Sequence, residues 1–264
     1  MTAEYSRIRV TRDGAVIRVT LSRPEARNAF DDHSIAELTS AFAEIAAQDD
    51  ARVVVLAGDG PVFCAGADVA WMRRAGSYSN AENEADAEKM ARMLRSIDAC
   101  PRPVIALAQG AAIGGGVGLL AAADVAIAAE GTVFSLAEVR LGILPAAISP
   151  YVLRAIGPRM ARDLFLTGDR FDAAEAHRIG LVHAVVPASE LESAGEKKVK
   201  SLLASGPQAV RAAKALIERV TGLSPEEALP LTVRAIAERR ASEEAKEGLS
   251  AFLEKRPPSW TRKA

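Results

Sequence analysis

The fold is decided by two glycine-bearing loops, Cys64-Ala65-Gly66-Ala67-Asp68 and Gly110-Ala111-Ala112-Ile113-Gly114-Gly115-Gly116. Each loop follows a hydrophobic run typical of a buried strand and precedes a stretch with helical character. Amides at the start of a helix have no intrahelical acceptor, and they lie at the positive end of the helix dipole. If the two loops meet, two such amides can stabilise an oxygen that becomes negative during a reaction. The sequence therefore predicts an anion site built from backbone.

Strands and helices alternate around these loops. The patterns predict a hairpin that turns at Asp13-Gly14, strands at Val53–Ala57, Pro103–Ala108, Val125–Ala129 and Val133–Ser135, and helices at His33–Gln48, up to about Asp98 and at Gly115–Ala123. The polar stretch Arg73–Glu84 is expected to be a mobile connection. Beyond Arg159 the chain is mainly helical except at Leu181–Val186, with helical periodicity in Leu191–Leu203, Pro207–Val220 and Glu226–Leu253. We expect an α/β core followed by a helical tail.

Composition narrows the possible partners. The chain has 264 residues, of which 49% are hydrophobic and 25% charged, and its formal net charge is −1. This balance gives no general attraction to nucleic acid or to an anionic membrane. The two cysteines, Cys64 and Cys100, lack the spacing of metal ligands, and no signal segment or apolar run of membrane-spanning length is present. A cytoplasmic protein with no metal is the simplest interpretation.

The second loop has two other interpretations. Gly114 and Gly116 begin like a dinucleotide-binding fingerprint, but the third glycine of that motif would fall on Leu119, and the loop lies in mid-chain. The glycines could also serve only to let a helix pack closely on a strand. Two loops of the same strand-to-helix kind favour the anion site over both.

Several motifs, in order along nearly the whole chain, resemble the enoyl-CoA hydratase/isomerase (crotonase) superfamily. They are Ala65-Gly66-Ala67-Asp68, Gly114-Gly115-Gly116, Asp124, Glu138, Leu141-Gly142-Ile143-Leu144-Pro145, Leu166-Thr167-Gly168-Asp169-Arg170 and the segment Glu247–Arg256. The resemblance implies an α/β spiral of ββα units over residues 1–200, which binds acyl-CoA, and a helical trimerisation region over residues 201–264. It also implies a homotrimer or a hexamer made of two trimers. The substrate would be a coenzyme A thioester, with no separate cofactor.

The resemblance also assigns roles to individual residues. Ala67 and Gly115 would supply the two oxyanion-hole amides, and Glu138 would be the acid–base. Ala65, Asp68 and Val69 would line the coenzyme A side, and Phe252 and Lys255 would reach coenzyme A from a neighbouring subunit. Arg23 and Arg27 are cations in a nearby loop and could bind the phosphates, or they could be ordinary solvated charges.

Other polar residues are expected to be structural. Glu138 could instead form a surface salt bridge with Arg140. Asp124 is expected to brace the fold, and Asp68 to accept backbone hydrogen bonds at a helix start. His33 is expected at the surface, His177 and His183 in structural roles, and Cys64 in packing.

The chain departs from the family pattern at Gly118. Family hydratases have a first glutamate there, which holds the attacking water together with the second, Glu138. A single carboxylate suffices to move a proton between carbons, which is isomerase chemistry. A Δ3-Δ2-enoyl-CoA isomerase therefore stays open, as does a non-catalytic acyl-CoA-binding protein.

A second departure is Ala146-Ala147-Ile148-Ser149, where many family hydratases continue with glycines. Together with Gly118, this segment resembles the bacterial methylglutaconyl-CoA hydratase branch of leucine breakdown. The expected reaction is reversible addition of water to an α,β-unsaturated acyl-CoA, with 3-methylglutaconyl-CoA as the predicted substrate. Its distal carboxylate would need a cation, for which Arg140 and Arg74 are the candidates, or it could itself help to hold the water.

Overall fold

A six-stranded sheet forms the centre of the molecule. The structure is a computed structural model that describes residues 5–261. The strand order is β1-β2-β3-β4-β6-β9, with β1 at Ile8–Asp13, β2 at Val16–Leu21, β3 at Val53–Gly58, β4 at Val104–Ala108, β6 at Val125–Ala129 and β9 at Ala184–Val186. The first two strands form the predicted antiparallel hairpin, and the other pairs are parallel.

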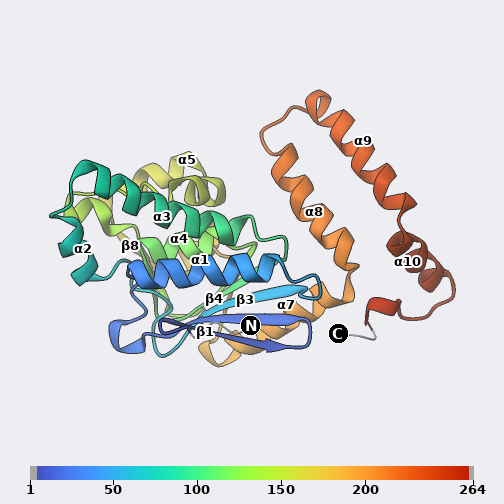
Figure 1. Cartoon of the computed structure of the whole chain (residues 1–264), viewed down its shortest axis with the longest axis horizontal. Coiled ribbons are helices and arrows are strands. Elements are labelled where there is room, and N and C mark those ends of the chain that lie inside the picture. The colour runs from blue at the N-terminus through green and yellow to red at the C-terminus, as the bar shows by residue number, and fades with distance from the viewer. Residues whose placement is uncertain (1–4, 262–264) are drawn as a thin grey trace.

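Helices cover both faces of this sheet because its central strands are apolar on both sides. Val54, Leu56 and Ala106 belong to a large core that they share with helices α1, α3, α4 and α5. Alternate residues, such as Val55 and Ile105, pack against α7 on the opposite face. The bounds are α1 Asp32–Ala46, α3 Asn80–Asp98, α4 Gly115–Ala122, α5 Ser149–Thr167 and α7 Leu191–Ala204. Figure 1 shows the first group on one side of the strands and α7 on the other.

A small second sheet joins the two glycine loops. It has the order β5-β7-β8, with β5 at Ala111–Ile113, β7 at Val133–Ser135 and β8 at Arg170–Phe171. Part of the second loop is thus a short strand, which the sequence patterns did not predict. Ala112 of β5 also forms a parallel bridge with Cys64 of the first loop. The two loops therefore meet, as the anion-site hypothesis requires.

The stretch Arg73–Glu84 is mostly helical, so the expectation of a mobile connection was wrong. Helix α2 (Val69–Ala75) occupies its start, and α3 begins at Asn80. Ser79 and Glu82 form a reciprocal capping box that fixes the start of α3. One wall of the pocket described below is consequently a helix.

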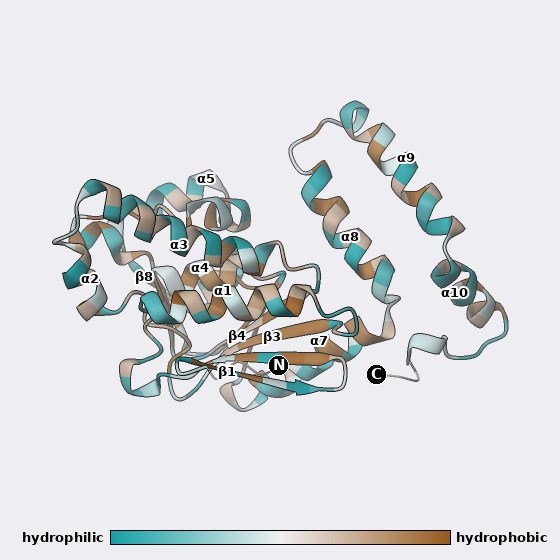
Figure 2. Ribbon diagram, viewed as in Figure 1, coloured by the Kyte–Doolittle hydropathy of each residue, from teal (hydrophilic) through white to brown (hydrophobic). Residues whose placement is uncertain are grey.

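Three C-terminal helices extend away from the sheet (Figure 1). They are α8 at Pro207–Val220, α9 at Pro225–Ala241 and α10 at Glu243–Leu253. The predicted continuous segment Glu226–Leu253 is divided at Ser242, whose hydroxyl caps α10 by accepting from the Ala245 amide. Figure 2 shows apolar and polar residues mixed along these helices. The division of the chain at residue 200 stays a prediction; α7 crosses it and packs on the sheet.

The remaining elements are short. They are α6 at Ala173–Arg178 and the 3-10 helices η1 at Pro24–Ala26, η2 at Ala137–Leu141, η3 at Ala188–Glu190 and η4 at Ser259–Thr261. Between residues 5 and 261, no helix has the length and apolar character that a bilayer crossing requires.

Candidate active site

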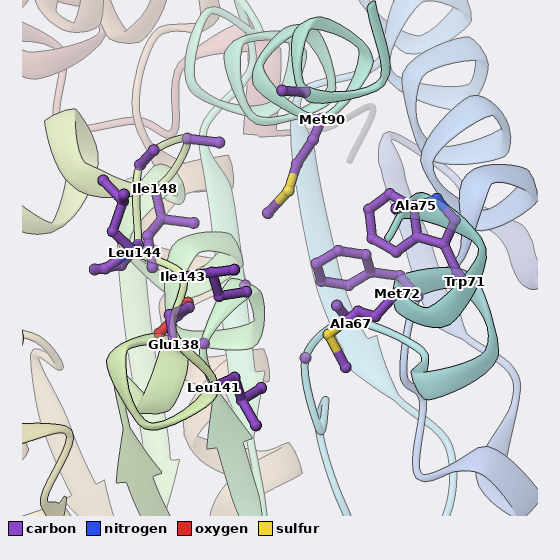
Figure 3. A pocket seen from close by; sticks show the side chains of 18 of the residues that line it. Ala67, Trp71, Met72, Ala75, Met90, Glu138, Leu141, Ile143, Leu144 and Ile148 are labelled. Carbon is purple, nitrogen blue, oxygen red and sulfur yellow. The ribbon is translucent and has the colours of Figure 1, made fainter. Parts of the chain in front are cut away.

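A cavity of about 310 Å³ lies where the two glycine loops meet. Its volume is within the range of small-molecule sites. Helices α2 and α3 and the segment after η2 complete its walls (Figure 3). Most lining side chains are apolar: Phe30, Trp71, Met72, Met90, Leu141, Ile143, Leu144 and Ile148. Among the described residues, the polar side chains of the lining are Asn83, Asp86 and Glu138.

The two loops are held together by backbone hydrogen bonds. The Cys64 amide donates to the Ala111 carbonyl at 3.1 Å, and the Ile113 amide donates to the Cys64 carbonyl at 3.0 Å. Gly66 approaches the second loop so closely that a Cβ there would lie 2.8 Å from the Ile113 oxygen and 3.9 Å from the Gly115 nitrogen. Only glycine permits this approach, which brings the first loop beside the Gly115 amide.

The amide of Ala67 points away from Phe30, the residue with which it is paired. Ala67 forms a parallel bridge with Phe30, in which the Phe30 amide donates to Gly66 and the Asp68 amide donates to Phe30. Because successive amides of an extended segment point in opposite directions, the Ala67 N–H lies on the other side. Within residues 5–261 it donates to no backbone acceptor. Ala67 itself lines the pocket.

Gly115 provides the second amide because it is the first residue of α4. The preceding Gly114 has φ 51° and ψ −116°, a conformation open to glycine, and its own amide donates to Ser135. As a first-turn amide, Gly115 has no intrahelical acceptor, and it lies at the positive end of the helix dipole. No backbone acceptor for it occurs in the described part of the chain. Both amides predicted for the oxyanion hole thus border one cavity.

Glu138 of η2 lies against the second loop. A Cβ on Gly114 would be 2.8 Å from its Oε1 atom. The Oε2 atom is buried and, among residues 5–261, without a hydrogen-bond partner. Burial raises the pKa of the Glu138 carboxyl above its ordinary value, because desolvation disfavours the charged form. A half-buried carboxyl with a raised pKa, in the same cavity as two open amides, is suited to donate and accept protons.

The space beside Gly118 is filled by Ile148. A Cβ on Gly118 would lie 2.2 Å from Ile148 Cγ2 and 2.9 Å from Ile148 Cβ. Ile148 is fully buried. The two departures from the family pattern, at Gly118 and at the segment that contains Ile148, are therefore linked, because these two residues pack against each other. A glutamate at position 118 is incompatible with the isoleucine at position 148.

The residues predicted to bind coenzyme A differ in their surroundings. Arg23 is only 13% exposed and donates to Asp68 at 3.0 Å and to the Ala29 carbonyl at 2.7 Å. Asp68 accepts from the Ala70 and Trp71 amides, the capping role expected of it, so Arg23 braces the start of α2. These bonds hold the pKa of Asp68 below its ordinary value despite burial, which raises it.

Arg27 is more accessible to a bound ligand than Arg23. It is exposed, and its carbonyl accepts from the amide of Ala65, a pocket-lining residue. Val69, 67% exposed, is next to Asp68. Phe252 is 80% exposed on α10, and Lys255 follows that helix. Figure 1 shows α10 far from α2 and α3, the helices that contribute to the pocket. A contact from these two to coenzyme A would have to come from another subunit, and it stays a prediction.

Neither candidate cation for a distal carboxylate lines the pocket. Arg140 pairs with Asp169, and Arg74 with Asp32 at 2.8 Å. Their assignment to the pocket was wrong, because both side chains are held by carboxylates outside it. The alternative pairing of Glu138 with Arg140 is wrong for the same reason.

The expected structural residues behave as predicted. Asp124 accepts from the Val104 amide and from Lys214 Nζ at 2.6 Å, which links β4 to α8. His33 is exposed, and His183 Nδ1 accepts from the Ala126 amide. Cys64 is buried, and burial raises the pKa of its thiol to about 12. It is therefore an unreactive packing residue.

The comparisons with known proteins identify the family of this chain. Residues 11–263 match the family model "Enoyl-CoA hydratase/isomerase". The crystal structure of an enoyl-CoA hydratase from Shewanella pealeana is 38% identical, with a TM-score of 0.94, and 97% of each chain is covered. AtuE of Pseudomonas aeruginosa is 37% identical, with a TM-score of 0.93, and the match covers 97% of this chain and 100% of AtuE.

A curated relative, enoyl-CoA hydratase domain-containing protein 2 of Homo sapiens, is 32% identical over 257 residues, or 95% of this chain and 87% of the relative. The fold and the backbone amides at the pocket define an enzyme of the crotonase type. The chain belongs to the enoyl-CoA hydratase/isomerase family. The predicted fold class and the prediction of an enzyme are thereby confirmed.

Proposed function

We propose that this chain adds water reversibly to an α,β-unsaturated acyl-CoA. The observation that supports this proposal most strongly is that the Ala67 and Gly115 amides and the Glu138 carboxyl border one apolar cavity. When water bonds to the β-carbon, the electrons of the double bond move toward the thioester oxygen, where the two amides stabilise the enolate. Glu138 then gives its proton to the α-carbon, and the proton that the water loses returns to Glu138 through solvent. The apolar walls strengthen these charge interactions by limiting access of solvent.

Isomerisation of a 3-enoyl-CoA to a 2-enoyl-CoA is the second candidate. The observation that favours it is the packing of Ile148 into the space beside Gly118, which leaves no room for a glutamate there. Glu138 alone could remove a proton from the α-carbon and return it to the γ-carbon. The same two amides would stabilise the intermediate enolate.

The substrate suggested by the sequence resemblance is 3-methylglutaconyl-CoA. The described lining of the pocket contains no Lys, Arg or His, so a distal carboxylate would depend on neutral donors, of which the Asn83 amide is one. A carboxylate that remains unpaired in such a pocket carries a desolvation cost. Whether the pocket can hydrogen-bond this distal carboxylate therefore decides which substrate is preferred: 3-methylglutaconyl-CoA or an enoyl-CoA with an uncharged acyl chain.

A side-by-side assay tests these proposals. Purified protein is given crotonyl-CoA, 3-methylglutaconyl-CoA and a 3-enoyl-CoA, and the products are separated and identified. Hydration of either 2-enoyl thioester supports the leading proposal, and its absence together with turnover of the 3-enoyl-CoA supports the isomerase. If no substrate is converted but acyl-CoA binds, the chain is a binding protein.

We also propose that the chain forms a homotrimer or a hexamer in the cytoplasm. The support for assembly is a set of large apolar side chains left exposed on α8 to α10 and their connections: Ile217, Leu223, Leu229, Val233, Ile236, Leu249, Phe252 and Leu253. Exposed apolar surface of this extent is typical of an interface. Light scattering in solution measures the assembly, and a monomer would contradict it.

A further inference from the structure

Because Ile148 fills the space beside Gly118, no carboxylate can project from that position. Among the described residues that line the pocket, one carboxylate remains besides Glu138. Ile148 occupies the position from which a glutamate at residue 118 would reach inward. Among the described lining residues, the remaining ionisable side chain is Asp86 of α3. Hydration needs a group that orients the attacking water, and Asp86 is the residue available for this task.

The spacing of residues on α3 explains why Asp86 faces the cavity. Asn83, Asp86, Ala87 and Met90 all line the pocket, and their separations of three, four and seven residues place them on one helix face. The same face continues with the buried Met93, Leu94 and Ile97, which anchor the C-terminal part of α3 in the core. Met90 reaches into the cavity from α3 (Figure 3), and its methyl group would be 3.2 Å from a Cβ on Gly115. Asp86 lies about one helical turn before Met90.

Three acidic residues of α3 have partners, whereas Asp86 and the exposed Glu84, which does not line the pocket, have none among the described residues. Glu82 belongs to the capping box, Glu88 pairs with Arg92, and Asp98 pairs with Arg154. Asp86 is half-buried, and within residues 5–261 it forms no salt bridge and no side-chain hydrogen bond. Its carboxylate is therefore free to accept a hydrogen bond from water in the pocket.

We propose that Asp86 holds and deprotonates the attacking water, in place of the carboxylate that Gly118 cannot provide. This inference rests on the proposed hydratase function. The water oxygen bonds to the β-carbon, its O–H bond breaks, and the proton passes to Asp86. The electron pair of the double bond moves onto the thioester as an enolate, and the α-carbon takes its proton from Glu138. Solvent then returns the proton from Asp86 to Glu138, so that the enzyme is unchanged.

The test separates chemistry that requires water from chemistry that does not. Exchange of the α-protons of butyryl-CoA in D₂O needs the two amides and Glu138 but no attacking water. We expect Asp86→Asn to lower kcat for hydration of crotonyl-CoA about 100-fold while α-proton exchange stays within about threefold of the wild type. Asp86→Glu should recover part of the hydration rate. Glu84→Gln is the matched control: it removes one charge from an exposed position of the same helix and should leave both rates unchanged.

Two results would overturn the role of Asp86. One is hydration by Asp86→Asn at the wild-type rate, and the other is an equal loss of hydration and exchange, which indicates a structural role. The proposed function fails separately, if the wild-type protein itself hydrates neither crotonyl-CoA nor 3-methylglutaconyl-CoA.

Discussion

In the proposed mechanism, two sets of groups that line the pocket, the backbone wall and the side-chain wall, would carry the chemistry, and they are built in different ways. The first consists of backbone, in which the Ala67 and Gly115 amides are oriented by a parallel bridge and a helix start. The second consists of side chains, with Glu138 from η2 and Asp86 from α3. The backbone wall is determined by the fold, because its donors do not depend on side-chain identity. The side-chain wall can change at single positions, which is where hydration and isomerisation would diverge.

The largest expected effect comes from the side-chain wall. Glu138→Gln keeps the size of the side chain but removes the exchangeable carboxyl proton. We expect kcat for turnover and for α-proton exchange to fall about 10²–10⁴-fold, while the Kd for butyryl-CoA stays within a few-fold. Steady-state kinetics and calorimetry measure the two quantities. Retained turnover would exclude Glu138 as the acid–base.

A substitution that disturbs the backbone wall should lower kcat somewhat less. In Gly115→Ala the new Cβ would lie 2.2 Å from Phe30 Cζ, so the first turn of α4 must shift and its amide moves. Loss of one oxyanion-hole donor lowers kcat about 10²–10³-fold. Gly76→Ala is the control, since its Cβ would lie no closer than 3.4 Å to a neighbour, outside the pocket. Comparable activity of both variants would contradict the assignment of Gly115.

The packing of Gly118 against Ile148 should appear as a coupling in stability. Gly118→Ala introduces a clash, which we expect to cost about 1–3 kcal/mol of unfolding free energy. Ile148→Ala creates a cavity that the new methyl group can partly fill. The double variant should therefore be less destabilised than the two single variants added together, by about 0.5–3 kcal/mol. Denaturant unfolding measures the cycle, and strict additivity would show that the two sites do not touch.

The smallest effect is a pH dependence of stability. Because burial raises the pKa of Glu138, the folded protein holds a proton at pH values where the unfolded chain, with an ordinary value of 4.5, has released it. Wild-type stability should therefore decline as pH rises above 4.5 through the raised pKa, whereas Glu138→Gln lacks this decline. Melting temperatures at pH 4 to 8 should show the variant gaining relative to the wild type as pH rises. A constant difference would contradict the raised pKa.

The sequence was most informative about the backbone wall. Hydrophobic runs predicted the strands before both loops, the glycines predicted close approach, and Asp68 was expected at a helix start. These features depend on neighbours in the chain, so local patterns suffice to detect them. Glu138 came from the family resemblance, and its place beside Gly114 agrees with the role proposed for it.

The side-chain wall was harder to predict because it depends on contacts between distant segments. The proximity of Ile148 to Gly118 and the position of Asp86 in the lining follow from tertiary packing alone. One local signal was available and missed: Ser79 and Glu82 have the spacing of a capping box, which indicates a helix in a stretch interpreted as a loop. The ion pair between Arg23 and Asp68, 45 residues apart, had no sequence signal.

The central claim is that two backbone amides hold the thioester oxygen. A crystal structure with bound butyryl-CoA tests it most directly. The account predicts the carbonyl oxygen about 2.7–3.1 Å from both the Ala67 and Gly115 nitrogens, with the Glu138 carboxyl facing the α-carbon. A carbonyl oxygen in contact with neither amide, or one bound only by side chains, would contradict it.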